Sequence, residues 1–147
     1  MSCLHLHLVI QPFLDEGYHY SNLLTWLKNN HAFSYTDYTK KTELIVYGWY
    51  GKHKFYGGFN TDVLEYNKPV KSPFHPTMKP LSLTAKLMTN SSKKGDNVLD
   101  CFGGSGTTLL VAEKLNRNCY MIEKDPHYCE TIIKRWENMT KQKAIKI

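Results

Sequence analysis

The sequence predicts an α/β fold, with a parallel strand–helix–strand unit in the C-terminal half and an antiparallel strand pair in the N-terminal half. Short apolar strand patterns alternate with helical patterns after residue 80, whereas segments 20–27 and 42–49 are rich in β-branched and aromatic residues. Four of the six prolines fall within 69–80 and mark a joint between these halves. The 147 residues, 41% of them hydrophobic, suit one globular domain.

The N-terminal half begins with an ambiguous apolar segment. The spacing of apolar residues in 4–14 fits a short helix or a strand, and we favour a helix that ends at Gly17. Segments 20–27 and 42–49 follow as strands, and the polar, aromatic-rich sequence between them predicts a connecting loop. The sequence therefore predicts one helix and a pair of strands before the joint.

The C-terminal half opens with a helix and a buried strand. Pro80 suits the first position of a helix, and the apolar spacing predicts this helix over 81–88. Gly95 and Asp96 then predict a turn into a short strand over 97–100.

A second helix, a second strand and a third helix follow. The broad apolar stripe of 107–115 is typical of a helix packed against a sheet, and 118–122 predicts a short strand. Asp125 and Pro126 favour the start of the last helix, because Asp is a good N-cap and Pro is tolerated at the first helical position. The strand–helix–strand order predicts a parallel pair with a crossover helix.

The composition limits the class of protein. The mean hydropathy is −0.46 and no long apolar stretch occurs, so we expect no transmembrane helix and no membrane partner. The N-terminus lacks a basic region and a cleavage site, so we expect a cytoplasmic protein. A net charge of +6 is compatible with polyanionic partners and equally with none.

The four cysteines show no disulfide or zinc pattern. They stand at positions 3, 101, 119 and 129, without a C-x-x-C pair or a metal-ligand spacing with histidine. Three of them lie within apolar segments, which predicts buried free thiols. We therefore expect no metal site.

A glycine-rich turn between the predicted strand and helix indicates a ligand site. Residues 100–108 read Asp-Cys-Phe-Gly-Gly-Ser-Gly-Thr-Thr, and the helix that follows opens with backbone N–H groups that favour negative charge. Glu123 stands at the tip of the next strand, where a carboxylate can accept both hydroxyls of a ribose. This arrangement predicts a ligand that contains a nucleoside; a glycine-rich turn without a ligand is the plainer alternative.

The choice of nucleoside follows from residues that the turn lacks. A phosphate-binding P-loop needs a lysine where Thr107 stands, and the dinucleotide pattern that starts at Gly104 needs a glycine where Leu109 stands. S-adenosylmethionine is then the preferred cofactor, with NAD as a second possibility.

Several motifs together resemble a known family. The chain is similar to the DNA amino-methyltransferases that form N6-methyladenine or N4-methylcytosine, in the group with the cofactor motifs at the C-terminus. This resemblance implies a partial Rossmann-like methyltransferase sheet. The segments that carry it are 74–80, 100–108, 119–129 and 133–136, and more faintly 23–28 and 42–48.

The resemblance also implies roles for particular residues. A segment that crosses the methionine end of the cofactor would contain His75, Thr77 and Lys79; the first cofactor wall would contain Asp100, Phe102, Gly103, Gly104, Ser105, Gly106 and Thr107; Glu123 would hold the ribose, with Asp125 close by. Alternatively, His75 is a turn residue and Lys79 is solvated. Cys101 stands where the family usually has proline.

The family's catalytic motif, Asp/Asn/Ser-Pro-Pro followed by an aromatic residue, does not occur in the sequence. No two of the six prolines are adjacent, and the segments Gln11–Phe13 and Ser72–Phe74 each hold only one. We therefore expect an incomplete methyltransferase domain that begins after the catalytic strand. Its expected parts are a remnant of the catalytic half in 1–66, the crossing segment 67–80 and a cofactor-binding unit 81–147.

An open sheet edge would need a second polypeptide or another copy to cover it. DNA is the expected partner of the assembled enzyme, and segment 26–41, with its aromatic, cationic and amide side chains, is either a DNA-contacting loop or a solvated hairpin. The C-terminal tail 141–147 is interpreted as solvated. Three hypotheses remain: a cofactor-binding portion of a DNA methyltransferase, an inactive binding remnant, and an NAD-dependent oxidoreductase.

Overall fold

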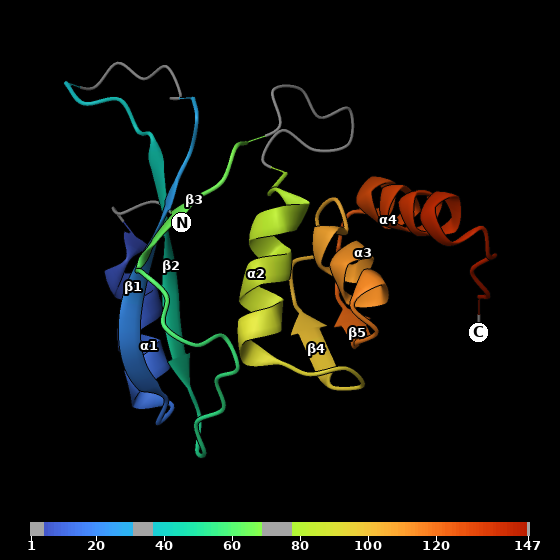
Figure 1. The fold of residues 1–147 in the computed structure, drawn as a ribbon. Helices are drawn as coiled ribbons and strands as arrows, with labels where there is room; N and C mark the ends of the chain where they lie inside the picture. The colour runs from blue at the N-terminus through green and yellow to red at the C-terminus, as the bar shows by residue number, and fades with distance from the viewer. Residues whose placement is uncertain (1–4, 31–36, 69–77, 147) are drawn as a thin grey trace. The chain divides into compact units, whose positions relative to one another are not determined.

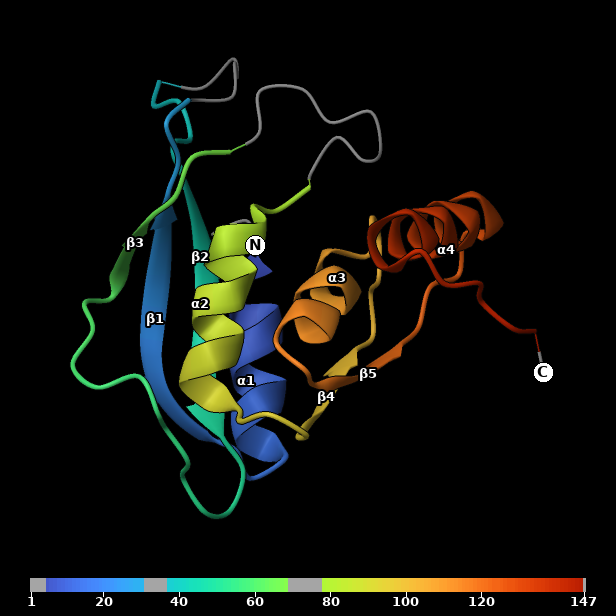
Figure 2. The same ribbon diagram turned by 45° about the vertical axis from the view of Figure 1, so that its right-hand side comes forward.

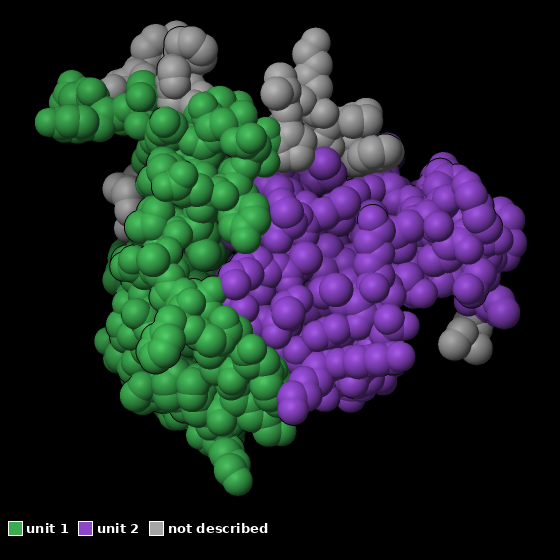
Figure 3. Space-filling model, in the orientation of Figure 1, with its two compact units in different colours: residues 1–68 green, residues 69–147 purple. Residues whose placement is uncertain are grey.

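The chain adopts a mixed α/β architecture in a computed structural model that describes residues 5–30, 37–68 and 78–146 (Figure 1). Residues 1–68 and 69–147 form two separate compact units, coloured differently in Figure 3. The division into 1–66, 67–80 and 81–147 stays a prediction.

The first unit is a three-stranded sheet with one helix. Helix α1 spans His7–Asp15, and the strands are β1 (His19–Leu27), β2 (Thr42–Trp49) and β3 (Val63–Glu65). The strand order is β2-β1-β3, with β2 antiparallel and β3 parallel to β1. The antiparallel strand pair expected from the sequence is confirmed.

Helix α1 packs against the strand pair through an aromatic residue that needs a glycine beneath it. A Cβ atom on Gly48 would lie 2.7 Å from the ring of Phe13. The ring can therefore pack this closely against β2 only because residue 48 has no side chain. The same ring lies 4.6 Å, between centroids, from that of Tyr18. The helix ends before Gly17, whose φ of 78° lies in the left-handed region, as expected from the sequence.

Trp26 is the central buried side chain of this unit. It is 1% exposed, and its indole Nε1 donates a hydrogen bond of 2.7 Å to the carbonyl of Tyr66. This bond ties the chain after β3 to β1. At the end of β1, the buried Lys28 pairs with Glu43 of β2, with 3.4 Å between Nζ and Oε1.

The second unit contains the parallel strand–helix–strand element. Its order is α2 (Leu81–Ser91), β4 (Asn97–Asp100), α3 (Thr107–Lys114), β5 (Asn118–Met121) and α4 (Pro126–Thr140). Strands β4 and β5 pair in parallel, and helix α3 connects them (Figure 2). This confirms the crossover unit that the sequence predicted.

The core of the second unit lies on one face of the β4–β5 pair. Met88 of α2 packs with Val111 and Ala112 of α3, and the half-buried Val98 and Cys119 contact this cluster from the two strands. Alternate residues along a strand point to opposite faces. The helices α2 and α3 therefore cover the sheet face that carries Val98 and Cys119.

The structure corrects some details of the sequence prediction. Pro80 is the residue before α2 rather than its first residue, because its ψ of 137° is extended. Three of the four cysteines were expected to be buried, and the described ones are free thiols: Cys101 is exposed, while Cys119 and Cys129 are half-buried. Strand β3 was not predicted. Among the described residues, no helix is long and apolar enough to span a membrane.

Candidate ligand site

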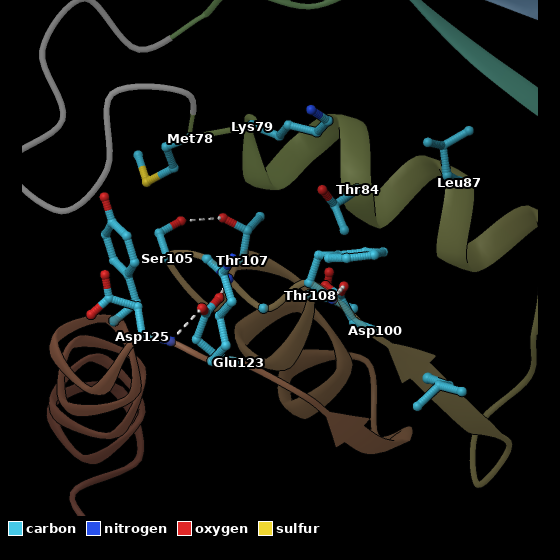
Figure 4. A pocket seen from close by; sticks show the side chains of 16 residues that line it. Met78, Lys79, Thr84, Leu87, Asp100, Ser105, Thr107, Thr108, Glu123 and Asp125 are labelled. Atoms are coloured by element: carbon cyan, nitrogen blue, oxygen red, sulfur yellow. Dashed lines mark hydrogen bonds between the residues drawn. The ribbon is translucent and has the colours of Figure 1, made fainter. Parts of the chain in front are cut away.

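A cavity of about 710 Å³ lies in the second unit, at the carboxyl ends of β4 and β5 (Figure 4). Parallel strands bring their carboxyl ends to one edge, where ligands bind in open α/β sheets. The lining residues come from the start of α2, the glycine-rich loop, the start of α3 and the link from β5 to α4. They are Met78, Lys79, Thr84, Leu87, Leu99, Asp100, Phe102, Gly103, Gly104, Ser105, Thr107, Thr108, Glu123, Lys124, Asp125 and Tyr128.

The glycine-rich loop is shaped by backbone geometry. Gly104 and Gly106 have φ values of 53° and 76°, in the region where a side chain would be strained. A Cβ atom on Gly103 would lie 2.7 Å from Sδ of Met121. The Asp100 side chain accepts a 3.0 Å hydrogen bond from the Phe102 N–H and so fixes the first turn of the loop.

Glu123 joins the loop to the β5–α4 link. Its Oε2 accepts a hydrogen bond of 2.6 Å from the N–H of Gly104, and its Oε1 accepts one of 3.0 Å from the N–H of Asp125. Each carboxylate oxygen has two lone pairs, so the group can accept further bonds from a ligand. Glu123 is therefore a structural tie that also lines the cavity.

The start of α4 confirms the capping predicted for Asp125. The Asp125 side chain accepts a 2.9 Å hydrogen bond from the N–H of His127, and Pro126 occupies the first helical position. The Cys129 thiol donates to the carbonyl of Glu123 at 3.4 Å. These contacts fix the link that carries both acidic side chains.

Helix α3 begins at the cavity wall. Its N-cap residue is Gly106, which has no side chain to cap the first backbone N–H groups. The hydroxyls of Ser105 and Thr107 lie 3.3 Å apart. The N-terminal end of a helix carries partial positive charge, so this wall favours an anionic group.

Two ionisable groups behind the cavity have shifted pKa values. Burial, and to a smaller extent the charge of Asp100, raise the pKa of the Cys119 thiol. Burial lowers the pKa of Arg135, whose Nη1 donates to the carbonyl of Ser105. The raised pKa keeps the Cys119 thiol neutral near pH 7.

The structure brings most of the site residues predicted from the sequence to one cavity. Those that line it are Lys79, Asp100, Phe102, Gly103, Gly104, Ser105, Thr107, Glu123 and Asp125. Gly106 lies behind the wall, where a Cβ would lie 3.0 Å from Ile132. His75 and Thr77 lie outside the described residues.

Several lining residues were not identified from the sequence. Thr84 and Leu87 are three residues apart on α2, so they share a helix face, and Figure 4 shows both beside the cavity. Tyr128 follows the cap of α4. The (i, i+3) spacing after Pro80 was the available signal, but the same spacing also fits a core-facing stripe.

Comparison with known proteins decides the family. Residues 4–135 match the model of a DNA methylase family, N6_N4_Mtase. The chain belongs to this DNA methylase family. The motif resemblance seen in the sequence is thereby confirmed.

Curated relatives in the DNA methylase family are type II methyltransferases. The chain is 30% identical over 150 residues to M2.MboI of Moraxella bovis, covering 88% of this chain and 54% of that protein. It is 33% identical over 142 residues to M2.DpnII of Streptococcus pneumoniae, covering 84% and 53%. The chain thus spans about half the length of these relatives.

Solved structures of DNA methyltransferases share the fold. The M1.HpyAVI–SAM complex superimposes with a TM-score of 0.78 at 30% identity, covering 91% of this chain and 70% of that one. The PvuII cytosine-N4-specific DNA methyltransferase also gives 0.78, at 19% identity, covering 90% and 57%. The Rossmann-like α/β fold expected for this DNA methylase family member is therefore confirmed.

Proposed function

We propose that this chain is the S-adenosylmethionine-binding portion of a DNA methyltransferase that modifies the exocyclic amine of adenine or cytosine. The observation that carries the proposal is Glu123, a carboxylate at the tip of β5 that lines the cavity beside the glycine-rich loop. M1.HpyAVI, 30% identical to this chain, has been solved in complex with SAM.

The residues around the cavity fit the chemistry of this cofactor. The cavity volume of about 710 Å³ is in the range of small-molecule sites. Glu123 would accept the ribose hydroxyls, while Asp100 and Asp125 offer negative charge to hydroxyl or ammonium groups. The start of α3 and the exposed Lys79 offer positive charge to a carboxylate.

The chain's contribution to the reaction would be positioning. When bound, the cofactor supplies an electrophilic methyl group. The loop and the β5–α4 link would hold the two ends of the cofactor in fixed places, because Glu123 ties both elements together. Fixed placement of reacting groups lowers the barrier by removing the entropy cost of orientation.

The hydrogen-bond acceptors for the target amine would come from another polypeptide. In the resembled family these are the side-chain oxygen and backbone carbonyl of the Pro-Pro motif, and the sequence holds no Pro-Pro pair. We propose that a second polypeptide supplies this motif and binds DNA with this chain. In the described part of the second unit, β4 and β5 pair only with each other, so their outer edges can accept an added strand.

Calorimetry tests the cofactor assignment. We expect saturable binding of S-adenosylmethionine to the purified chain and no binding of NAD. Binding of NAD without binding of S-adenosylmethionine would replace this proposal with the oxidoreductase alternative.

Methyl transfer tests the need for a second chain. Tritiated methyl transfer to DNA should be absent with this chain alone. It should appear when a polypeptide that carries the Asp-Pro-Pro-Tyr type of motif, such as the product of a neighbouring reading frame, is added. If the chain binds the cofactor but no such combination transfers methyl groups to DNA, the chain is an inactive binding remnant and not part of an active enzyme.

A further inference from the structure

Helix α4 contacts the glycine-rich loop through Ile132 and Arg135, which are not among the residues that line the cavity. Ile132 of α4 is 8% exposed and lies directly beneath Gly103 and Gly106, where added Cβ atoms would come within 3.1 Å and 3.0 Å of it. Further along α4, the indole of Trp136 donates a 3.0 Å hydrogen bond to Glu113 of α3. The helix is thus fixed to the element that the loop leads into.

Arg135 extends this support to the backbone of the loop. Its Nη1 donates a hydrogen bond to the carbonyl of Ser105, thirty residues earlier in the chain. Ser105 is 6% exposed, and the guanidinium itself is half-buried. A hydrogen bond from a charged donor in a partly buried place is stronger than a neutral one.

The loop is therefore held at two neighbouring residues by groups of opposite charge. The Glu123 carboxylate binds the N–H of Gly104, and the Arg135 guanidinium binds the carbonyl of Ser105. Gly104 has a left-handed φ of 53°, so this part of the loop has several accessible backbone conformations when it is free. The two contacts select one of them.

We propose that Arg135 is a positioning residue that holds the Gly104–Ser105 segment in the conformation that binds the cofactor. The proposal rests on the proposed function for the identity of the cofactor, but the effect on the loop itself is independent of it. Arg135 is absent from the cavity lining, and its bond to the Ser105 carbonyl connects it to a residue that does line the cavity.

Three substitutions test this role. Arg135→Met removes the donor and keeps an unbranched side chain, whereas Arg135→Lys keeps a long side chain with a charged N–H donor. Lys134→Met is the matched control, because the adjacent Lys134 is exposed and pairs only weakly with Glu130 at 3.2 Å.

We expect Arg135→Met to raise the Kd for S-adenosylmethionine by about 10-fold or more, from the loss of a hydrogen bond to a charged group. Arg135→Lys should lose less affinity than Arg135→Met, and Lys134→Met should bind like the unmodified chain. Amide hydrogen exchange without cofactor should accelerate at residues 103–107 in Arg135→Met and stay unchanged over 97–100.

The outcomes separate this inference from the function. If the unmodified chain does not bind S-adenosylmethionine, the proposed function fails, while loop exchange still tests Arg135. If Arg135→Met binds as tightly as the unmodified chain and exchanges at the same rate in 103–107, the positioning role is wrong. A lower Tm of Arg135→Met and Arg135→Lys, with an unchanged Kd and unchanged exchange in 103–107, would show a merely structural role and would also overturn the positioning role.

Discussion

Replacing Glu123 with glutamine gives a sharp test of the site, because the two side chains have nearly the same shape. In the protein, one carboxylate oxygen accepts from Gly104 N–H at 2.6 Å and the other from Asp125 N–H at 3.0 Å. The glutamine carbonyl can keep only one of these bonds. Its NH₂ group then faces the other backbone N–H, donor against donor.

The expected magnitude follows from these contacts. If the glutamine turns its NH₂ group toward the part-buried N–H of Gly104, that donor stays unsatisfied and the free energy of unfolding of the second unit should fall by about 1–3 kcal/mol; if the NH₂ group faces the exposed N–H of Asp125, the loss should be near the lower end of this range. The ribose hydroxyls would meet a donor in place of an acceptor, so we also expect the Kd for S-adenosylmethionine to rise by about 10-fold or more.

Urea unfolding followed by circular dichroism, and calorimetric titration with S-adenosylmethionine, measure the two effects. Glu130→Gln is the matched control, since Glu130 lies on the exposed face of α4 and is 69% exposed. It should change the free energy of unfolding by less than about 0.5 kcal/mol. If Glu123→Gln behaves like this control in both measurements, the reasoning about the tie and the ribose contact is refuted.

Three further substitutions or conditions give measurable outcomes. Gly106→Ala, at a φ of 76°, should destabilise the second unit by about 1–2 kcal/mol in urea unfolding, and an unchanged midpoint would contradict the left-handed conformation. Trp26→Phe leaves the Tyr66 carbonyl without its indole donor and should cost about 1–3 kcal/mol, visible as a lower Tm of the first unit; an equal Tm would speak against the bond. The hydrogen bond from the N–H of Ala144 is the main cause that lowers the pKa of the Glu137 carboxyl. The stabilisation from this contact is therefore fully present above the ordinary pKa of 4.5 and is lost as the pH falls through the lowered pKa. The protection factor of the Ala144 amide, taken against its intrinsic exchange rate at each pH, should fall only in that acidic range, and a protection factor that stays constant from pH 7 to pH 3 would disprove the contact.

Local signals allowed the second unit to be predicted. Three of its features depend only on neighbouring residues and can therefore be predicted from the local sequence: the turn at Gly95, the glycine-rich loop and the Asp125 cap. The cavity at the carboxyl ends of β4 and β5 follows from the same pattern, because parallel strands place their carboxyl ends together.

Contacts between distant segments were not visible in the same way. Strand β3 has only three residues in a polar segment, and it is a strand because β1 offers an edge for parallel pairing. Cys101 directly follows β4, which ends at Asp100, and it is exposed because the strand has already ended and the chain turns at the cavity. The bond from Arg135 to Ser105 spans thirty residues and depends on how α4 packs.

The double tie made by Glu123 has a consequence for how tightly a small ligand can be held. Because the loop and the β5–α4 link are already joined by hydrogen bonds, the entropy of ordering them is lost when the chain folds and not when the ligand arrives. Association should then resemble insertion into a rigid receptor. Affinity for the ligand and the thermodynamic stability of this unit should rise and fall together.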